Sequence, residues 1–153
     1  MIELFRGQTG QGDLTIVHLT TGEAVSKNLL PQAPFLCGVT LSDPHWSAGW
    51  LTAVIRDLIE NGAAYLAFYG PRCEEAHDIA DHVRDVVSPN EGDDVVMTTW
   101  HESESLVDYL WFLAFVAFPT DGYASASSRY CVLDIGRATN PALVSAVREV
   151  FVP

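Results

Sequence analysis

The sequence predicts a three-layer α/β domain, in which helices cover both faces of a mainly parallel sheet of about five strands, as in Rossmann-like and flavodoxin-like folds. Short apolar runs alternate with segments whose apolar residues recur every three to four positions. Strands and helices that alternate in this way form right-handed βαβ units and therefore a parallel sheet. With 153 residues, we expect a single domain over residues 1–153 that buries roughly 70% of the surface of its unfolded chain.

The first strand is expected at residues 14–19. Residues 20–34 hold two prolines and no helical pattern, so this strand is predicted to lie at an edge of the sheet, with antiparallel pairing left open. Further strands are expected at residues 35–41, 64–69, 94–99 and 129–135.

Four helices are expected between and after the later strands. Asp43-Pro44 and Asn140-Pro141 each place a capping side chain before a proline at the first helical position. Gly62 suits the position just beyond a helix end. The predicted helices run from Asp43 to Gly62, from Gly70-Pro71 to about Val87, from a Ser103 cap to Phe118 and from Asn140 to Phe151, with a turn at residues 88–92.

The third of these helices is apolar almost all round, which a helix covering one face of a sheet does not require. Two explanations stay open: the N-terminal segment or loops cover it, or it forms an interface in a homodimer or with another partner. The side chains predicted for such an interface are Trp111, Phe112, Phe115 and Phe118.

The chain has 8 basic and 20 acidic residues and a net charge of −12. Nucleic acid is therefore excluded as a partner, because binding phosphates requires Lys and Arg. The acidity fits either a solvated surface or an acidic inhibitor or immunity protein that docks on a basic partner. Three cysteines, an odd number, and the absence of a leader pattern or a long apolar run predict a cytoplasmic protein that does not cross a membrane.

Polar side chains follow the predicted strands at their carboxyl ends, which meet at one edge of a parallel sheet, where doubly wound folds bind ligands. We therefore expect a binding or protein-interaction domain that uses a crevice at this edge, for a small molecule or protein that the sequence does not identify. The residues predicted to contact the ligand are Asp43, His45, Gly70, Arg72, Thr99, Trp100, Glu102, Asp134 and Arg137.

The alternative is a thiol-dependent hydrolase or transferase with Cys73 as nucleophile and His77 or His101 as base, because a helix N-terminus stabilises a thiolate. The other reading, which we favour, is that Cys73 is a buried structural residue. The spacing of Cys73 and His77 also suits two ligands of one metal, with His101 or Asp78 as a third. No CxxC or HxH pair supports a metal and no glycine-rich phosphate loop occurs, so no metal or cofactor is predicted.

Two segments, Tyr69-Gly70-Pro71-Arg72-Cys73-Glu74-Glu75-Ala76-His77-Asp78 and Val95-Val96-Met97-Thr98-Thr99-Trp100-His101, resemble a family of small bacterial proteins classed as a domain of unknown function. The resemblance covers roughly residues 35–118. It implies a bacterial origin and a compact α/β domain, and it implies no activity.

Overall fold

A computed structural model describes residues 1–88 and 94–152, so most of the turn predicted at residues 88–92 lies outside the described residues. The strands are β1 (Ile2–Gln8), β2 (Asp13–Thr20), β3 (Phe35–Leu41), β4 (Ala63–Tyr69), β5 (Met97–His101) and β6 (Arg129–Gly136). The helices are α1 (Ala48–Glu60), α2 (Cys73–Val87), α3 (Leu106–Phe115) and α4 (Pro141–Phe151), with 3-10 segments at Lys27–Leu29 and Asp121–Ser128.

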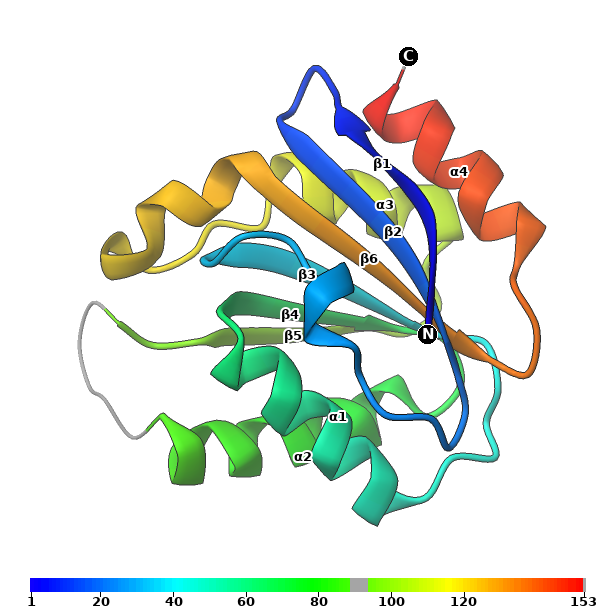
Figure 1. Cartoon of the computed structure of the whole chain (residues 1–153), viewed down its shortest axis with the longest axis vertical. Coiled ribbons are helices and arrows are strands. Elements are labelled where there is room, and N and C mark those ends of the chain that lie inside the picture. Colours follow the sequence, from blue (N-terminus) through cyan, green and yellow to red (C-terminus); the bar gives the residue numbers. More distant parts are fainter. Residues whose placement is uncertain (89–93, 153) are drawn as a thin grey trace.

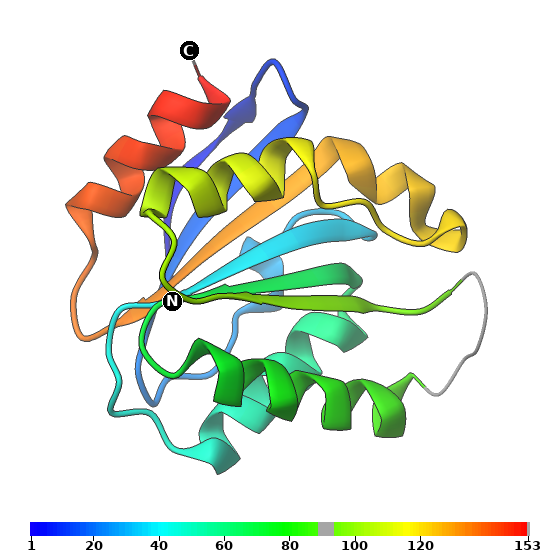
Figure 2. The same cartoon turned by 180° about the vertical axis from the view of Figure 1, so that it is seen from behind.

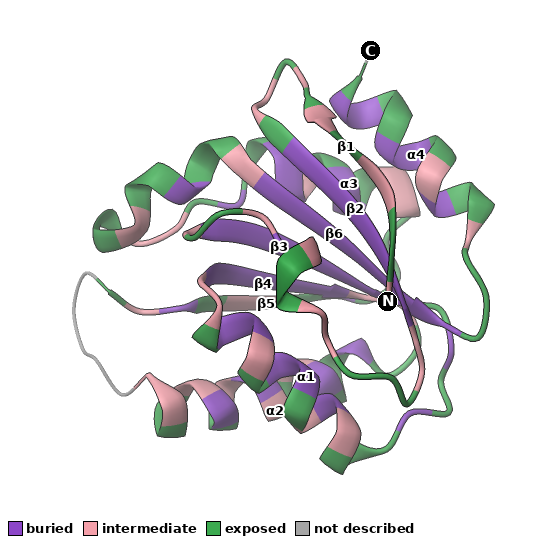
Figure 3. Cartoon of the chain, in the orientation of Figure 1, coloured by how far each residue is buried: buried purple, intermediate pink, exposed green. Residues whose placement is uncertain are grey.

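The six strands form one sheet in the order β1-β2-β6-β3-β4-β5 (Figure 1). The five strands from β2 to β5 in this order are mutually parallel, while β1 pairs antiparallel with β2. The predicted fold class is confirmed. The expectation that residues 14–19 form the edge is wrong, because β1 occupies that edge and places β2 inside the sheet. The polar residues Glu3, Arg6 and Gln8 interrupt β1, and none of its residues is buried (Figure 3), so it lacks the apolar run that marks the other strands.

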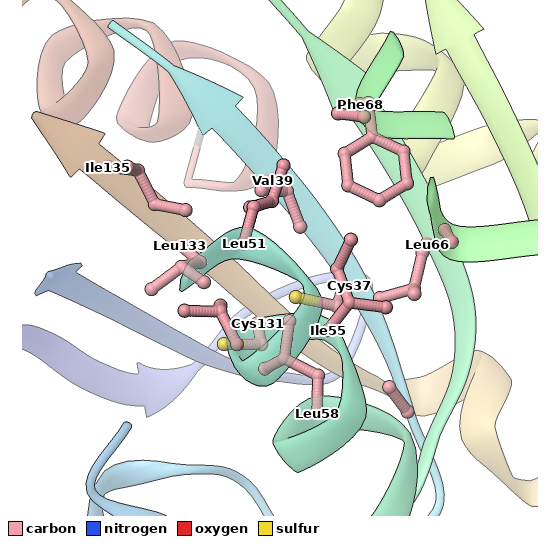
Figure 4. Close-up of a cluster of buried hydrophobic side chains, with 14 of the residues drawn as sticks. Cys37, Val39, Leu51, Ile55, Leu58, Leu66, Phe68, Cys131, Leu133 and Ile135 are labelled. Atoms are coloured by element: carbon pink, nitrogen blue, oxygen red, sulfur yellow. The ribbon is translucent and has the colours of Figure 1, made fainter. Parts of the chain in front are cut away.

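The helices cover both faces of the sheet. Helices α1 and α2 lie on one face, and α3 and α4 lie on the other (Figures 1 and 2). Each face has its own buried cluster, and α1 packs Leu51, Ile55 and Leu58 onto the first (Figure 4). Cys37 and Cys131 are register partners in that cluster, fully buried as free thiols. The neighbouring Cys131 thiol and burial together hold the pKa of Cys37 well above its usual range.

Three helices begin later than predicted, and α2 starts at Cys73 with Arg72, not Gly70, as its N-cap. The Asp43 carboxylate accepts the backbone N–H of His45 and caps no helix, and α1 begins only after Ser47, which caps it by accepting the N–H of Trp50. Ser103 has a φ of 64°, unlike the extended backbone that a capping residue normally adopts. Ser105 therefore caps α3 by accepting the N–H of Asp108.

Helix α3 also ends before the predicted residue, Phe118. The backbone N–H groups of Val116 and Ala117 both donate to the carbonyl oxygen of Phe112, which closes the helix after Phe115. By contrast, the cap predicted for α4 is confirmed, since the Asn140 side chain accepts from the N–H groups of Ala142 and Leu143. Within residues 1–88 and 94–152, every helix falls short of the length and apolarity that crossing a membrane requires.

Candidate functional site

Strands β3 and β6 are neighbours at the centre of the sheet, but the chain leaves them toward opposite faces. The segment after β3 leads to α1 on one face, and the segment after β6 leads to α4 on the other (Figure 1). Such a reversal is the topological switch point, the place where open α/β sheets bind ligands. Here the two segments border an open hollow of ≈ 370 Å³, the switch-point cleft, lined by Ser42, Asp43, Pro44, His45, Gly136, Arg137 and Ala138.

Asp134 on β6 lies beneath this cleft and is completely buried. Its Oδ2 lies 2.9 Å from Nδ1 of buried His18 on β2 and accepts the backbone N–H of Asn140 at 3.0 Å. Its Oδ1 accepts the Ser42 hydroxyl at 3.3 Å. One carboxylate therefore ties β2 and the segments that follow β3 and β6 to each other.

Asp43 is the second buried carboxylate of the switch-point cleft. One oxygen accepts the backbone N–H of His45 at 2.9 Å and lies 2.9 Å from Nδ1 of the same residue. The other accepts the Thr21 hydroxyl at 3.1 Å and lies 3.6 Å from Nε of Arg137. The backbone N–H of His45, with smaller contributions from the His45 ring, Thr21 and Arg137, lowers the pKa of Asp43, so the group is a carboxylate at neutral pH.

A second hollow of ≈ 410 Å³, the α2 cleft, lies between the segments that follow β4 and β5. Its lining consists of Tyr69, Gly70, Pro71, Arg72, Cys73, Glu74, Glu75, His101, Glu102, Ser103 and Glu104. Gly70 has a φ of 103°, and a side chain there would collide with the carbonyl oxygen of Leu41. The turn into α2 therefore requires glycine at this position.

Arg72 connects the segment after β3, which lines the switch-point cleft, to the start of α2, which lines the α2 cleft. Its guanidinium donates to the carbonyl oxygens of Pro44 at 2.7 Å and Trp46 at 3.0 Å, and it forms a bidentate pair with Glu75 at 2.8 Å. It also lies 3.7 Å from the centre of the Trp46 ring. This predicted ligand contact therefore uses its donors to fix the segment after β3 against α2.

Cys73 is only 2% exposed and packs in the core cluster between the sheet and α2. Burial raises the pKa of its thiol, which lowers the thiolate fraction at neutral pH. His77 contacts Asp78 at 3.2 Å and Asp81 at 3.6 Å. Among the described residues, no hydrogen bond joins Cys73 to the imidazole of His77 or of His101. These observations favour a structural thiol.

The side chain of His101 lies on the face of the sheet opposite α2. Its ring is 4.4 Å from the Phe112 ring and 5.3 Å from the Tyr109 ring, both on α3. Nδ1 lies 3.0 Å from Glu104, and Nε2 lies 3.1 Å from the Thr99 hydroxyl. Trp100, the next residue along β5, points the other way and packs against His77 of α2 at 4.5 Å. Alternation along β5 thus separates the His101 imidazole from the Cys73 thiol.

The predicted ligand contacts therefore divide into three groups. Asp43, His45 and Arg137 line the switch-point cleft above Asp134, and Gly70, Arg72 and Glu102 line the α2 cleft. Thr99 and Trp100 line neither cleft. In the described part of the chain, no three His, Cys, Asp or Glu side chains converge as a metal site.

Sequence reasoning missed His18, Thr21 and Ser42 as parts of this polar network. Ser42 directly follows a predicted strand, a signal that was available in the sequence. His18 looks like a core residue, and its partner is 116 positions away along the chain.

The four side chains predicted for an interface differ in how far they are exposed. Phe112 is half-buried and lies against His101 and Tyr65. Trp111, Phe115 and Phe118 are exposed.

Comparison with known proteins identifies one family. A family model described as "Domain of unknown function (DUF7684)" matches residues 14–150. A search of curated proteins finds no match. The match spans nearly the whole chain, from β2 to α4, so the chain belongs to this family.

Proposed function

We propose that this member of the DUF7684 family binds a small anionic molecule in the switch-point cleft, with the Arg137 guanidinium as its main hydrogen-bond donor. The hollow of ≈ 370 Å³ falls within the range of about 300–1,000 Å³ that is usual for small-molecule sites. Its position is also the one at which doubly wound sheets bind ligands.

The observation that carries the proposal is the distribution of satisfied and unsatisfied polar groups. Both carboxylates of the site, Asp43 and Asp134, already accept hydrogen bonds from the protein on both of their oxygens. The Arg137 guanidinium is not used up in the same way. Its side chain is 77% exposed and contacts Asp43 through Nε. The exposed His45 ring beside it contacts Asp43 through Nδ1.

The charged side chain with free hydrogen-bond donors at this cleft is therefore that of Arg137. A guanidinium recognises an acceptor-rich group such as a carboxylate or a phosphate. The contact with Asp43 orients the Arg137 side chain, which reduces the ordering that a ligand must cause.

The proposal is tested by thermal unfolding of the whole chain with inorganic phosphate, succinate, the cation putrescine or glucose, all at one ionic strength. Constant ionic strength matters because a chain of charge −12 responds to salt screening alone. Phosphate or succinate should raise the melting temperature, and the other two should not. Stabilisation by putrescine alone, or by none of the compounds, contradicts the proposal.

Two charge-matched variants locate the effect. Arg137→Ala should weaken binding of the active anion by about 10-fold or more, the usual cost of losing a charge-assisted hydrogen bond. Arg56→Ala removes the same charge from the exposed side of α1 and should leave binding unchanged. An equal loss in both variants would show that the anion responds to net charge and not to this cleft.

A further inference from the structure

Helix α3 carries large apolar side chains on the side that faces away from the sheet. Tyr109, Leu110 and Leu113 point into the core. Four other side chains are between 41% and 71% exposed, two on α3 and two just after its end, and we name them together the α3 aromatic face: Trp111, Phe115, Val116 and Phe118. The rings of Trp111 and Phe115 contact each other, with 5.2 Å between their centres. A helix that only covers a sheet needs one apolar face, so this second one requires a separate explanation.

The described residues do not cover this face. The N-terminal segment, one of the two covers considered from the sequence, is β1, which pairs with β2 at the edge of the sheet. The other apolar flank of the helix is occupied, because Phe112 lies against Tyr65 and His101. Exposed clusters of large apolar side chains mark interaction surfaces in soluble proteins.

We propose that the α3 aromatic face is the contact surface of a homodimer, in which α3 of one copy packs on α3 of a second copy around a two-fold axis. Such a contact is self-complementary, since each copy contributes the same residues. A second copy therefore supplies the same apolar side chains that the first copy presents.

Charge favours a second copy over a basic protein as the occupant. Residues 106–118 contain one charged residue, Asp108, although the chain as a whole carries −12. A basic partner would gain little from a face that offers it almost no negative charge. Two acidic chains can approach each other with the least repulsion at this uncharged surface.

The available area agrees with a dimer of moderate affinity. At their exposed fractions, the four side chains offer about 400 Å² of apolar surface, since a large aromatic side chain buries about 150–250 Å². Two copies would bury on the order of 800 Å² through these side chains alone, and flanking atoms bring the total toward the ~1,000 Å² that a specific interface needs. A dissociation constant in the micromolar range is expected.

The test is sedimentation equilibrium of the full chain from low micromolar to submillimolar concentration, at two salt concentrations. We expect a monomer–dimer equilibrium that tightens or stays constant as salt rises, because salt screens the repulsion between acidic chains and leaves the apolar contact intact. A monomer at every concentration overturns the proposal, and it does so even if a different molecule binds this face.

Single variants then place the interface. Trp111→Ser and Phe118→Ser should each weaken dimerisation at least 10-fold, and Trp111→Phe should restore most of it. Val86→Ser is the matched control, since Val86 is a 61% exposed apolar residue on α2, on the opposite face of the sheet. Urea midpoints of the dilute monomers should agree with that of the wild type, which separates lost association from lost folding. A dimer that Trp111→Ser and Phe118→Ser leave intact contradicts the proposed surface.

Discussion

Replacing Asp134 by alanine is the change that most strongly perturbs the base of the switch-point cleft. The carboxylate is fully buried and contacts the His18 ring at 2.9 Å, the Asn140 N–H at 3.0 Å and the Ser42 hydroxyl at 3.3 Å. Asp134→Ala leaves these groups without their acceptor. His18 and Asp134 sit opposite each other in the register of β2 and β6, so no nearby strand shift restores the contact.

The expected loss in unfolding free energy is about 3 kcal/mol or more, since each buried polar group left without a hydrogen-bond partner costs about 1–3 kcal/mol. Asp134→Asn keeps the volume and one carbonyl oxygen and should lose about 1–3 kcal/mol. Urea unfolding followed by tryptophan fluorescence measures both values. The variants His18→Ala and Asp134→Ala should combine with less than additive effect, because each removes the same contact.

Asp85→Ala serves as the control, since Asp85 is an exposed partner of Arg84 and should cost less than about 1 kcal/mol. If Asp134→Ala costs no more than Asp85→Ala, the buried network does not hold the cleft together. Additive effects of the His18 and Asp134 variants would refute the pairing itself.

The remaining predictions concern a thiol, a carboxylate and a glycine. Cys73 should resist iodoacetamide in the native protein because its pKa is raised and its side chain is buried; rapid alkylation near pH 6 would instead support a catalytic thiolate. Because the folded pKa of Asp43 is lowered, its contribution to stability should be complete above about pH 4 and disappear as the pH falls through the lower folded value. Asp43→Asn should therefore reduce the change of the urea midpoint with pH below about pH 4. A pH dependence parallel to that of the wild type would contradict this. Gly38→Ala should lower the unfolding free energy by about 1–3 kcal/mol, because the new Cβ would lie 2.6 Å from the Tyr109 hydroxyl. Gly49→Ala, in an open position of α1, should raise it by about 0.5–1 kcal/mol. Equal effects of the two changes in thermal unfolding would refute the close packing of α3 on β3.

The fold class was predictable because its signals are local. The apolar runs of β3, β4 and β6 and the Asn140-Pro141 cap each act within a few residues. Strand β1 escaped prediction because its pairing with β2, and not its own sequence, makes it a strand. The start of α1 was misplaced because the Asp43 carboxylate accepts the N–H of His45 and the hydroxyl of the distant Thr21, and so caps no helix.

The candidate site was predictable only in outline. The carboxyl edge of the sheet does collect Asp43, His45, Asp134 and Arg137, as the alternation of strands and helices indicated. Local sequence patterns do not reveal the order of strands in a sheet. They therefore did not show that β3 and β6 are neighbours or that the edge divides into two clefts. Alternation along β5, which turns His101 toward α3 and away from Cys73, depends on a strand that begins later than predicted.

The central claim, anion binding at the switch-point cleft, is tested most directly by titrating the 15N-labelled chain with inorganic phosphate at constant ionic strength and following the backbone amide signals. The account predicts saturable shifts at residues 42–46 and 136–140 that disappear in Arg137→Ala and persist in Arg56→Ala. Saturable shifts confined to residues 69–75 and 101–104 would place the anion in the α2 cleft instead. Shifts that never saturate, or that spread evenly over the chain, would contradict the claim of a built anion site.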